Sequence, residues 1–93
     1  MKFSVVIPAH NEERYLPACL DALAKAAQSY RSEVEFIVVL NRCTDETERI
    51  AVACGARVVR EDRRSLAAIR NAGAQCATGD ILVTVDADSV ARK

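Results

Sequence analysis

Residues 34–40 of the sequence read VEFIVVL, and this stretch decides the fold class. It is apolar nearly throughout, which is typical of a strand covered on both faces in a parallel sheet. A similar run, FSVVI at residues 3–7, precedes it, and we expect Pro8 to end that strand. Two further apolar runs follow at residues 56–59 and 81–85. The sequence therefore predicts four strands.

Helical patterns separate these four strands. The first pattern predicts a helix over residues 17–29, after a loose turn at residues 12–16. The second is expected to start at Thr44 as the N-cap and to close at Gly55. Ser65 is expected to cap the third helix. Strands that alternate with helices in this way imply right-handed crossovers and a parallel sheet covered by helices.

Composition excludes several classes of protein. The chain has 93 residues of which 51% are hydrophobic, enough for a packed core, so it is not a disordered tail. Thirteen basic and thirteen acidic residues balance, which gives no electrostatic reason to expect nucleic acid as a partner. No apolar run approaches the roughly 20 residues of a membrane span. No small-residue cleavage site follows the opening apolar run, so we expect a cytoplasmic protein.

The four cysteines lack the C-x-x-C spacing of zinc or redox sites, so we expect reduced thiols. Three of them are expected on apolar helix faces: Cys19, Cys54 and Cys76. Cys43, at the start of the second helix, could be a nucleophile, but no general base is visible near it in the sequence.

Polar clusters follow three of the four strands, at residues 10–12, 41–45 and 86–88. In parallel α/β sheets, ligands bind beyond the carboxyl ends of the strands. We therefore expect the three clusters to converge on one edge of the sheet. The chain has only three glycines, and they form neither the dinucleotide-binding nor the P-loop pattern, which disfavours both of those enzyme classes.

Asp86 and Asp88 are candidate metal ligands. In an extended segment, residues two apart point to the same side. Carboxylate oxygens suit Mg²⁺ or Mn²⁺, and such an ion could bridge the two phosphates of a nucleotide. Each candidate also has an explanation without function. The D-x-D segment could simply be polar residues at the end of a strand, and Arg70 could lie on a solvent-exposed helix face. His10 could be only a hydrogen-bonding group.

Four ordered motifs resemble the N-terminal half of family 2 glycosyltransferases, which have the GT-A fold. The motifs read SVVIPAHNEE at residues 4–13, VVLNRCTDET at 38–47, IRNAG and ATGD within 69–80, and VTVDAD at 83–88. The resemblance covers nearly the whole chain. It implies a three-layer, Rossmann-like α/β fold with a parallel sheet in the order 3-2-1-4, and one unit over residues 1–93.

The resemblance also implies function. The full-length protein would use a nucleotide-diphosphate sugar and move the sugar to an acceptor hydroxyl, usually with inversion. The implied nucleotide-sugar-binding residues are Pro8, Ala9, His10, Asn11, Glu12, Asn41, Arg70 and Asp86. Asp86 and Asp88 would hold Mn²⁺ or Mg²⁺. The family's general base lies after the motif that contains Asp86 and Asp88. We therefore assign no catalytic residue within the chain and expect the chain alone to be inactive.

One departure from the family concerns the end of the second strand. Many members have an acidic pair there, whereas this chain has Leu40 and Asn41. The carboxylate that accepts the uracil N–H in those members is missing at Leu40, although the amide oxygen of Asn41 can still accept a hydrogen bond. The donor nucleotide therefore stays open between UDP, GDP and others.

Two other functions stay open. The chain could be a non-catalytic nucleotide-binding fragment. Residues 86–90 also fit the D-x-D-x-[TV] pattern of haloacid-dehalogenase-like phosphohydrolases, although there the motif follows the first strand. We further expect the apolar fourth strand, residues 81–85, to lie at the sheet edge and to promote self-association, and the full-length protein could associate peripherally with a membrane.

Overall fold

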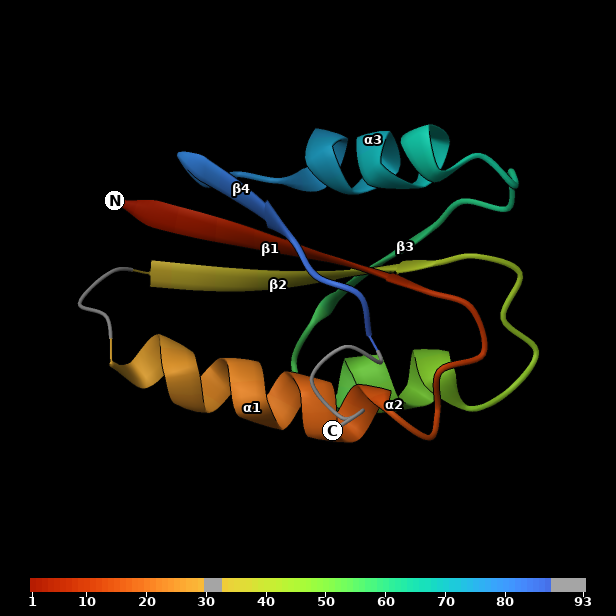
Figure 1. Ribbon diagram of the computed structural model, residues 1–93, viewed down its shortest axis with the longest axis horizontal. Helices are drawn as coiled ribbons and strands as arrows, with labels where there is room; N and C mark the ends of the chain where they lie inside the picture. The colour runs from red at the N-terminus through yellow and green to blue at the C-terminus, as the bar shows by residue number, and fades with distance from the viewer. Residues whose placement is uncertain (30–32, 88–93) are drawn as a thin grey trace.

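The computed structural model describes residues 1–29 and 33–87 and shows a four-stranded parallel sheet between two layers of helices (Figure 1). The strand order is β3-β2-β1-β4, as predicted. Helices α1 and α2 cover one face and α3 covers the other (Figure 1), which makes three layers. The elements are β1 (Lys2–Ala9), α1 (Leu16–Gln28), β2 (Glu33–Leu40), α2 (Thr47–Ala53), β3 (Arg57–Arg60), α3 (Leu66–Cys76) and β4 (Ile81–Thr84).

Strand β1 lies at the centre of the sheet and divides the core. It pairs with β2 along its whole length and with β4 over residues 3–6. Successive side chains point to opposite faces, so Val5 and Ile7 pack in the core beneath α1 and α2, whereas Val6 packs under α3. Gly73 of α3 permits close packing there, because a Cβ atom at this position would lie 2.4 Å from Val6 Cγ1.

The prediction that Pro8 ends the first strand is wrong, because β1 continues to Ala9. Backbone groups of successive strand residues point to alternate sides. The Val6 carbonyl accepts from Val85 N on the β4 side, and the Ala9 carbonyl accepts from Asn41 N on the β2 side. Pro8 therefore faces the β4 side, beyond the point where β4 is paired, and its missing N–H costs no ladder hydrogen bond.

Two expectations about α2 are also wrong. Its N-cap is Glu46 rather than Thr44, and the side chain of Glu46 makes no capping hydrogen bond. Thr44 does not cap α2 because it lies three residues before the first helical residue, Thr47, where its N–H and hydroxyl donate to Asn11 Oδ1. Cys54 is exposed rather than on a buried face, because the helix ends at Ala53 and Cys54 is its C-cap. All four thiols are free, as expected, and Cys19 is buried while Cys76 is half-buried.

Other local predictions are confirmed. Gly55 has φ +83°, a conformation that favours glycine, directly after α2. Ser65 caps α3, since its Oγ accepts a hydrogen bond from Ala68 N at 3.3 Å. Within the described ranges, 1–29 and 33–87, no helix is both long enough and apolar enough to cross a bilayer.

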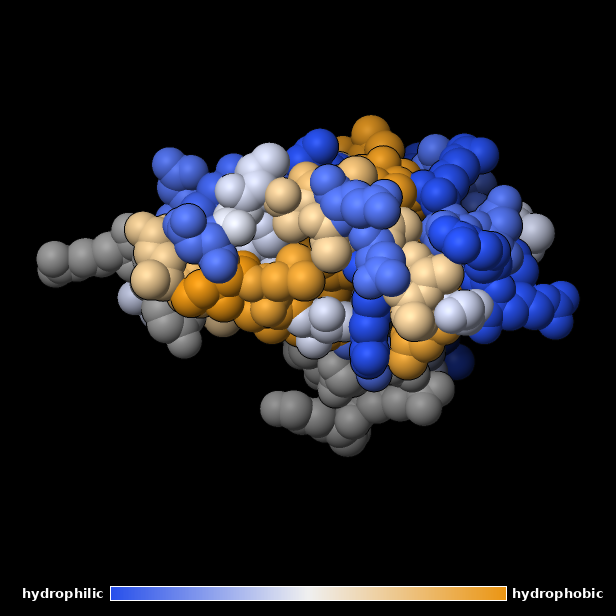
Figure 2. Space-filling model, turned by 90° about the horizontal axis from the view of Figure 1, so that it is seen from above, coloured by the Kyte–Doolittle hydropathy of each residue, from blue (hydrophilic) through white to orange (hydrophobic). Residues whose placement is uncertain are grey.

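The two edge strands of the sheet differ in character. β3 has arginines at both ends, Arg57 and Arg60, and each forms an ion pair with a carboxylate. β4 carries no charge, and Ile81, Leu82 and Val83 are 37–49% exposed along it. An apolar strip is visible on this side of the molecule (Figure 2). Strand β4 is therefore the edge open to further pairing.

Candidate functional site at the carboxyl edge of the sheet

The polar clusters after β1 and β2 meet at the carboxyl edge of the sheet, as the sequence predicts. Asn11 Oδ1 accepts hydrogen bonds from Thr44 N at 2.7 Å and from Asp45 N at 3.3 Å. Glu12 N donates to Thr47 Oγ1 at 2.9 Å. These contacts join segments more than 30 residues apart in the sequence into one surface.

Two residues of this surface adopt the left-handed backbone conformation without being glycine. They are Asn11, at φ 50°, and Arg42, at φ 53°. Asparagine tolerates this region, but it is uncommon for arginine. Arg42 is held there by a hydrogen bond from its N–H to Asp62 Oδ1 at 3.3 Å. Strained backbone of this kind is concentrated at functional sites, which supports this edge as the site.

Asp45 and Thr47 form a structural pair that the sequence analysis missed. Asp45 Oδ1 accepts from the backbone N–H of Thr47 at 2.9 Å and from its hydroxyl, and Oδ2 accepts from Glu13 N at 3.2 Å. Burial acts to raise the pKa of Asp45, but these hydrogen bonds outweigh it and lower the pKa below its ordinary value of 3.8. The D-x-T spacing just before a helix is the signal that could have revealed the pair.

His10 is exposed, and its ring is oriented by one hydrogen bond. Nδ1 lies 2.7 Å from the carbonyl oxygen of Asn41. A carbonyl oxygen only accepts, so Nδ1 carries the proton and donates it. In the neutral ring Nε2 then carries the lone pair, which can accept a hydrogen bond from a ligand.

Asn41 is 3% exposed, and its side chain is hydrogen-bonded within the protein. Its Nδ2 donates to the carbonyl oxygens of Glu61 at 2.6 Å and Arg63 at 2.7 Å. Its Oδ1 accepts from Arg42 Nε at 3.0 Å. The side-chain amide of Asn41 thus hydrogen-bonds the loop after β3 to the end of β2. The carboxylate of Glu61 is bound in turn by Arg63, whose side-chain hydrogen bond lowers the pKa of Glu61 to about 2.

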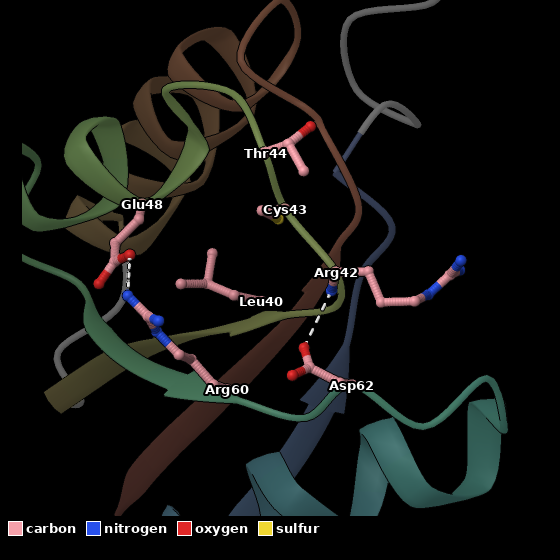
Figure 3. A pocket seen from close by; sticks show the side chains of 7 residues that line it. All are labelled: Leu40, Arg42, Cys43, Thr44, Glu48, Arg60 and Asp62. Atoms are coloured by element: carbon pink, nitrogen blue, oxygen red, sulfur yellow. Dashed lines mark hydrogen bonds and ion pairs between the residues drawn. The ribbon is translucent and has the colours of Figure 1, made fainter.

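A cavity of about 470 Å³ opens at the ends of β2 and β3 (Figure 3). Figure 3 shows Leu40 near its centre, the Glu48–Arg60 ion pair on one side and the Arg42 side chain extending away from it. Its lining combines apolar, thiol, hydroxyl and charged groups: Leu40, Arg42, Cys43, Thr44, Glu48, Arg60 and Asp62. An apolar centre with a polar rim suits a small planar group with polar edges.

The exit of β4 reaches the same edge. Val85 N donates to the Val6 carbonyl at 3.0 Å, and Ala87 is 2% exposed in the core cluster that contains Ala9 and Leu40. Asp86, between them, is exposed. Its predicted partner Asp88 lies outside the described residues. Within residues 1–29 and 33–87, no group of three His, Cys, Asp or Glu side chains is placed to hold a metal ion.

The remaining predicted residues lie at different depths. Pro8 is half-buried and Ala9 is buried, so Ala9 contributes its backbone: its carbonyl accepts from Asn41 N at 2.8 Å. Arg70 is exposed on α3, and no hydrogen bond or ion pair joins it to another predicted site residue in the described part of the chain. The structure thus joins the β1 and β2 segments directly and leaves Arg70 separate.

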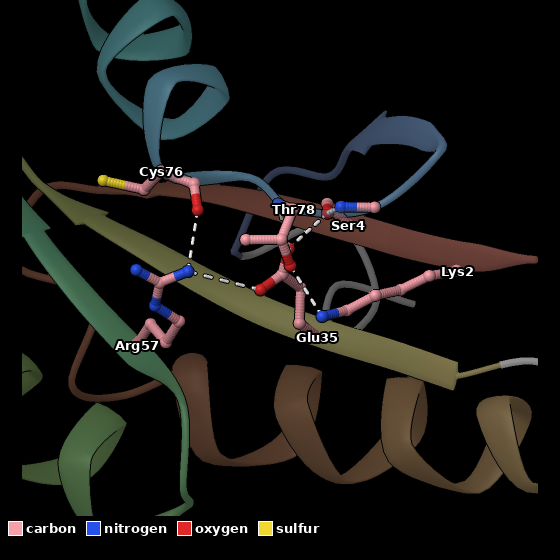
Figure 4. Close-up of polar contacts among 7 residues, drawn as sticks. Lys2, Ser4, Glu35, Arg57, Cys76 and Thr78 are labelled. Carbon is pink, nitrogen blue, oxygen red and sulfur yellow. Dashed lines mark hydrogen bonds and ion pairs between the residues drawn. The ribbon is translucent and has the colours of Figure 1, made fainter.

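A second polar network lies at the amino-terminal end of the sheet, away from this site (Figure 4). Glu35 Oε2 accepts from Ser4 Oγ at 2.5 Å and from the backbone N–H and hydroxyl of Thr78. Arg57 Nη1 lies 3.4 Å from Glu35 Oε1 and donates to the Cys76 carbonyl at 2.7 Å. We call these residues the Glu35 network. Because it joins β1, β2, β3 and the segment before β4, its role is structural.

The sequence matches known glycosyltransferases. Residues 4–93 match the profile of Glycosyl transferase family 2. An uncharacterized glycosyltransferase of Mycobacterium tuberculosis is 40% identical over 85 residues, which are 91% of this chain and 36% of that protein. The undecaprenyl-phosphate 4-deoxy-4-formamido-L-arabinose transferase of Pseudomonas fluorescens is 34% identical over 91% of this chain and 27% of its own length. The chain therefore spans about a third or less of these relatives.

Solved structures give the same result. S. aureus TarS, residues 1–349, superposes with a TM-score of 0.83 at 32% identity, over 95% of this chain and 28% of that one. Glucosyl-3-phosphoglycerate synthase from Mycobacterium tuberculosis, in complex with Mn²⁺, UDP and glucosyl-3-phosphoglycerate, superposes at 0.78 and 32% identity, over 92% of this chain and 33% of that one. The predicted GT-A architecture is confirmed, and the phosphohydrolase alternative is left without support. The chain belongs to glycosyl transferase family 2.

Proposed function

We propose that the complete protein transfers a sugar from a nucleotide-diphosphate donor to an acceptor hydroxyl, and that this chain forms its donor-binding part. The observation that carries the proposal is the junction of the β1 and β2 loops through Asn11 at the carboxyl edge. Ligands of parallel α/β sheets bind at this edge. Support also comes from the synthase that superposes on this chain, whose structure is in complex with UDP.

The donor nucleotide would lie along the loop that follows β1. Pro8, Ala9 and His10 would line the base and ribose, together with Asn11 and Glu12. The Nε2 atom of the exposed residue His10 would accept a hydrogen bond, and backbone groups of the loop would supply further contacts. Asp86 would reach the ribose or the metal from the exit of β4.

Arg70 would neutralise charge on the diphosphate. It is an exposed guanidinium near the middle of α3, and it has no carboxylate partner in the described part of the chain. A guanidinium can form two parallel hydrogen bonds to a phosphate group. This proposal predicts that Arg70 contributes to binding and little to folding.

A divalent cation would be held by Asp86 and Asp88. The donor set fits, because Asp86 presents an exposed carboxylate at the edge and carboxylate oxygens suit Mn²⁺ and Mg²⁺. Solved structures of the synthase contain Mn²⁺ or Mg²⁺ together with UDP. When bound, such a cation neutralises the leaving diphosphate.

We assign no general base within this chain. Asp45, a carboxylate hydrogen-bonded to Glu13 N and Thr47, has a lowered pKa, so it is a weak proton acceptor. We propose that the general base of the complete protein lies in the region that corresponds to the part of the relatives not matched by this chain. The isolated chain would then bind nucleotide without transferring sugar. Cytoplasmic location, and peripheral membrane association of the complete protein, stay predictions.

Calorimetry with UDP and with GDP, with and without Mn²⁺, tests the proposed function. We expect one of the two to bind, and Mn²⁺ to strengthen binding. Arg70→Ala should weaken binding by about tenfold, since one charge-assisted hydrogen bond contributes about 1.5 kcal/mol. Lys25→Ala removes an exposed cation from α1 and serves as the control. No binding of either nucleotide, or equal losses of binding and folding in Arg70→Ala, would contradict the proposal.

A further inference from the structure

Asn41 connects three segments that are far apart in the sequence. Its backbone N–H donates to the Ala9 carbonyl at 2.8 Å, and its carbonyl accepts from His10 Nδ1 at 2.7 Å. Its side chain donates to the carbonyl oxygens of Glu61 at 2.6 Å and Arg63 at 2.7 Å. One buried residue therefore holds the end of β1, the end of β2 and the loop after β3 together.

This geometry requires an amide rather than a carboxylate. Both protons of Nδ2 are directed at carbonyl oxygens, so Oδ1 must face the other way, where Arg42 Nε donates to it at 3.0 Å. A carboxylate at the same position would place an acceptor against two acceptors in a site that is 3% exposed. Unpaired buried acceptors are costly, so an ionised aspartate in this chain would lose both hydrogen bonds that Asn41 Nδ2 donates.

The loop that Asn41 holds leads directly into α3. Glu61 N donates to the Leu40 carbonyl at 3.0 Å, and Asp62 accepts from the backbone of Arg42. The loop ends at Ser65, the N-cap of α3, and α3 carries Arg70. The position of the loop therefore fixes where α3 begins relative to the loops that follow β1 and β2.

We propose that Asn41 is a positioning residue of the nucleotide site and does not contact the nucleotide itself. It aligns His10 on one side and the start of α3 on the other, and it uses its side-chain amide entirely within the protein. This inference rests on the proposed nucleotide-binding function. It replaces the role that the family resemblance implied for Asn41, in which the amide oxygen accepts a hydrogen bond from the base.

Asn41→Asp distinguishes the two roles by the sign of its effect. If Asn41 contacts a base N–H, a carboxylate is the stronger acceptor, and the variant should bind UDP as tightly as the wild type or more tightly. If Asn41 positions the loop, the variant should lose about tenfold or more in affinity at about pH 8, since buried hydrogen bonds are broken. Calorimetry with UDP and with GDP in the presence of Mn²⁺ measures the change. Equal or tighter binding overturns the proposal.

The pH profile gives a second readout. Once protonated, the introduced carboxyl group can donate to one of the two carbonyl oxygens, so the ratio of variant to wild-type affinity should rise between about pH 8 and pH 5. The ionisable groups that face this position are present in both proteins, so the ratio removes their effects: His10, Arg42, Glu61, Asp62 and Arg63. A ratio that does not change with pH overturns the proposal.

Amide hydrogen exchange reports on the loop without any nucleotide. In Asn41→Asp and in Asn41→Ala, residues 61–65 should lose protection while the backbone of β1 and β2 keeps it. Gln75→Glu makes the same amide-to-carboxylate change at an exposed position of α3, and it should alter neither exchange nor binding. If the loop stays protected in both Asn41 variants, the positioning role is wrong. If the wild type binds no nucleotide, the proposed function fails, while the exchange data still test Asn41.

Discussion

Replacing Glu35 with glutamine would test what holds the amino-terminal end of the sheet together. One oxygen of this carboxylate, Oε2, accepts hydrogen bonds from Ser4 Oγ and from both the backbone N–H and the hydroxyl of Thr78. Glutamine keeps one acceptor oxygen but loses the charge. Its NH₂ group must then face either these donors or the guanidinium of Arg57, and both arrangements put donor against donor.

The expected loss follows from the pKa of Glu35. The hydrogen bond from the Ser4 side chain, followed by that from the backbone N–H of Thr78, lowers this pKa from 4.5 to about 2. At 1.36 kcal/mol for each pKa unit, the network stabilises the ionised form by about 3 kcal/mol. The Glu35 side chain is only 12% exposed, so solvent screens these contacts little. A domain of this size is stable by about 5–14 kcal/mol, so the loss would be a large fraction.

Urea unfolding followed by circular dichroism measures the effect. Because the folded-state pKa is lowered, the stabilisation is fully present above about pH 4.5 and is lost as the pH falls towards about 2. At about pH 7, Glu35→Gln should therefore unfold at a lower urea concentration with an unchanged m-value. Below pH 4.5, the stability difference from the wild type should shrink.

Glu33→Gln is the matched control, since Glu33 is an exposed residue of the same strand. It should leave the urea midpoint nearly unchanged. Glu61 and Asp45 also have lowered pKa values and contribute to the acid sensitivity of every variant, so only differences between variants are informative. Equal midpoints for the wild type and Glu35→Gln at neutral pH, or a stability difference that does not depend on pH, would refute the reasoning.

Two further predictions concern packing. Gly73→Ala should destabilise the fold by about 1–3 kcal/mol, because the new Cβ atom would lie 2.4 Å from Val6 Cγ1 and α3 would have to lift from the sheet; thermal unfolding checks this, and an unchanged Tm would contradict it. Leu82→Lys should reduce self-association of the isolated chain, because a charge on the exposed β4 edge opposes pairing with a second copy. Sedimentation velocity measures the self-association, and a wild type that stays monomeric at high concentration would contradict the prediction that β4 promotes it.

The alternation of strands and helices, and hence the layered parallel sheet, could be predicted because it depends on patterns that lie within short segments. The strand order was predicted from the family resemblance, because it depends on which distant strands pair. The apolar run that ends at Leu40 and the caps at Gly55 and Ser65 are local signals, and all of them correspond to the observed elements. The convergence of polar loops on one edge followed from the parallel topology alone.

The failed predictions depend on contacts between distant segments. Thr44 does not cap α2 because the helix begins only at Thr47, after a segment whose N–H groups at Thr44 and Asp45 donate to Asn11 Oδ1, more than 30 residues earlier. Pro8 stays within β1 because β4 is too short to need a partner at that position. The orientation of the Asn41 amide depends on the carbonyl oxygens of a loop 20 residues away. None of these partners can be identified from the sequence near the residue concerned.

The central place of β1 in the sheet also has a consequence for how the protein is made. Lys2 is fixed by Asp80, 78 residues later in the chain, and β1 pairs on that side only with β4. At about 5–20 residues per second, a ribosome would need on the order of 4–16 seconds to deliver the partner of a strand it had already released. During that interval β1 can pair with β2 alone, and one side of it is open to chaperones or to other nascent chains. Strand β1 is thus synthesised before both of the strands that flank it, and its second side is paired only after β4 has been made.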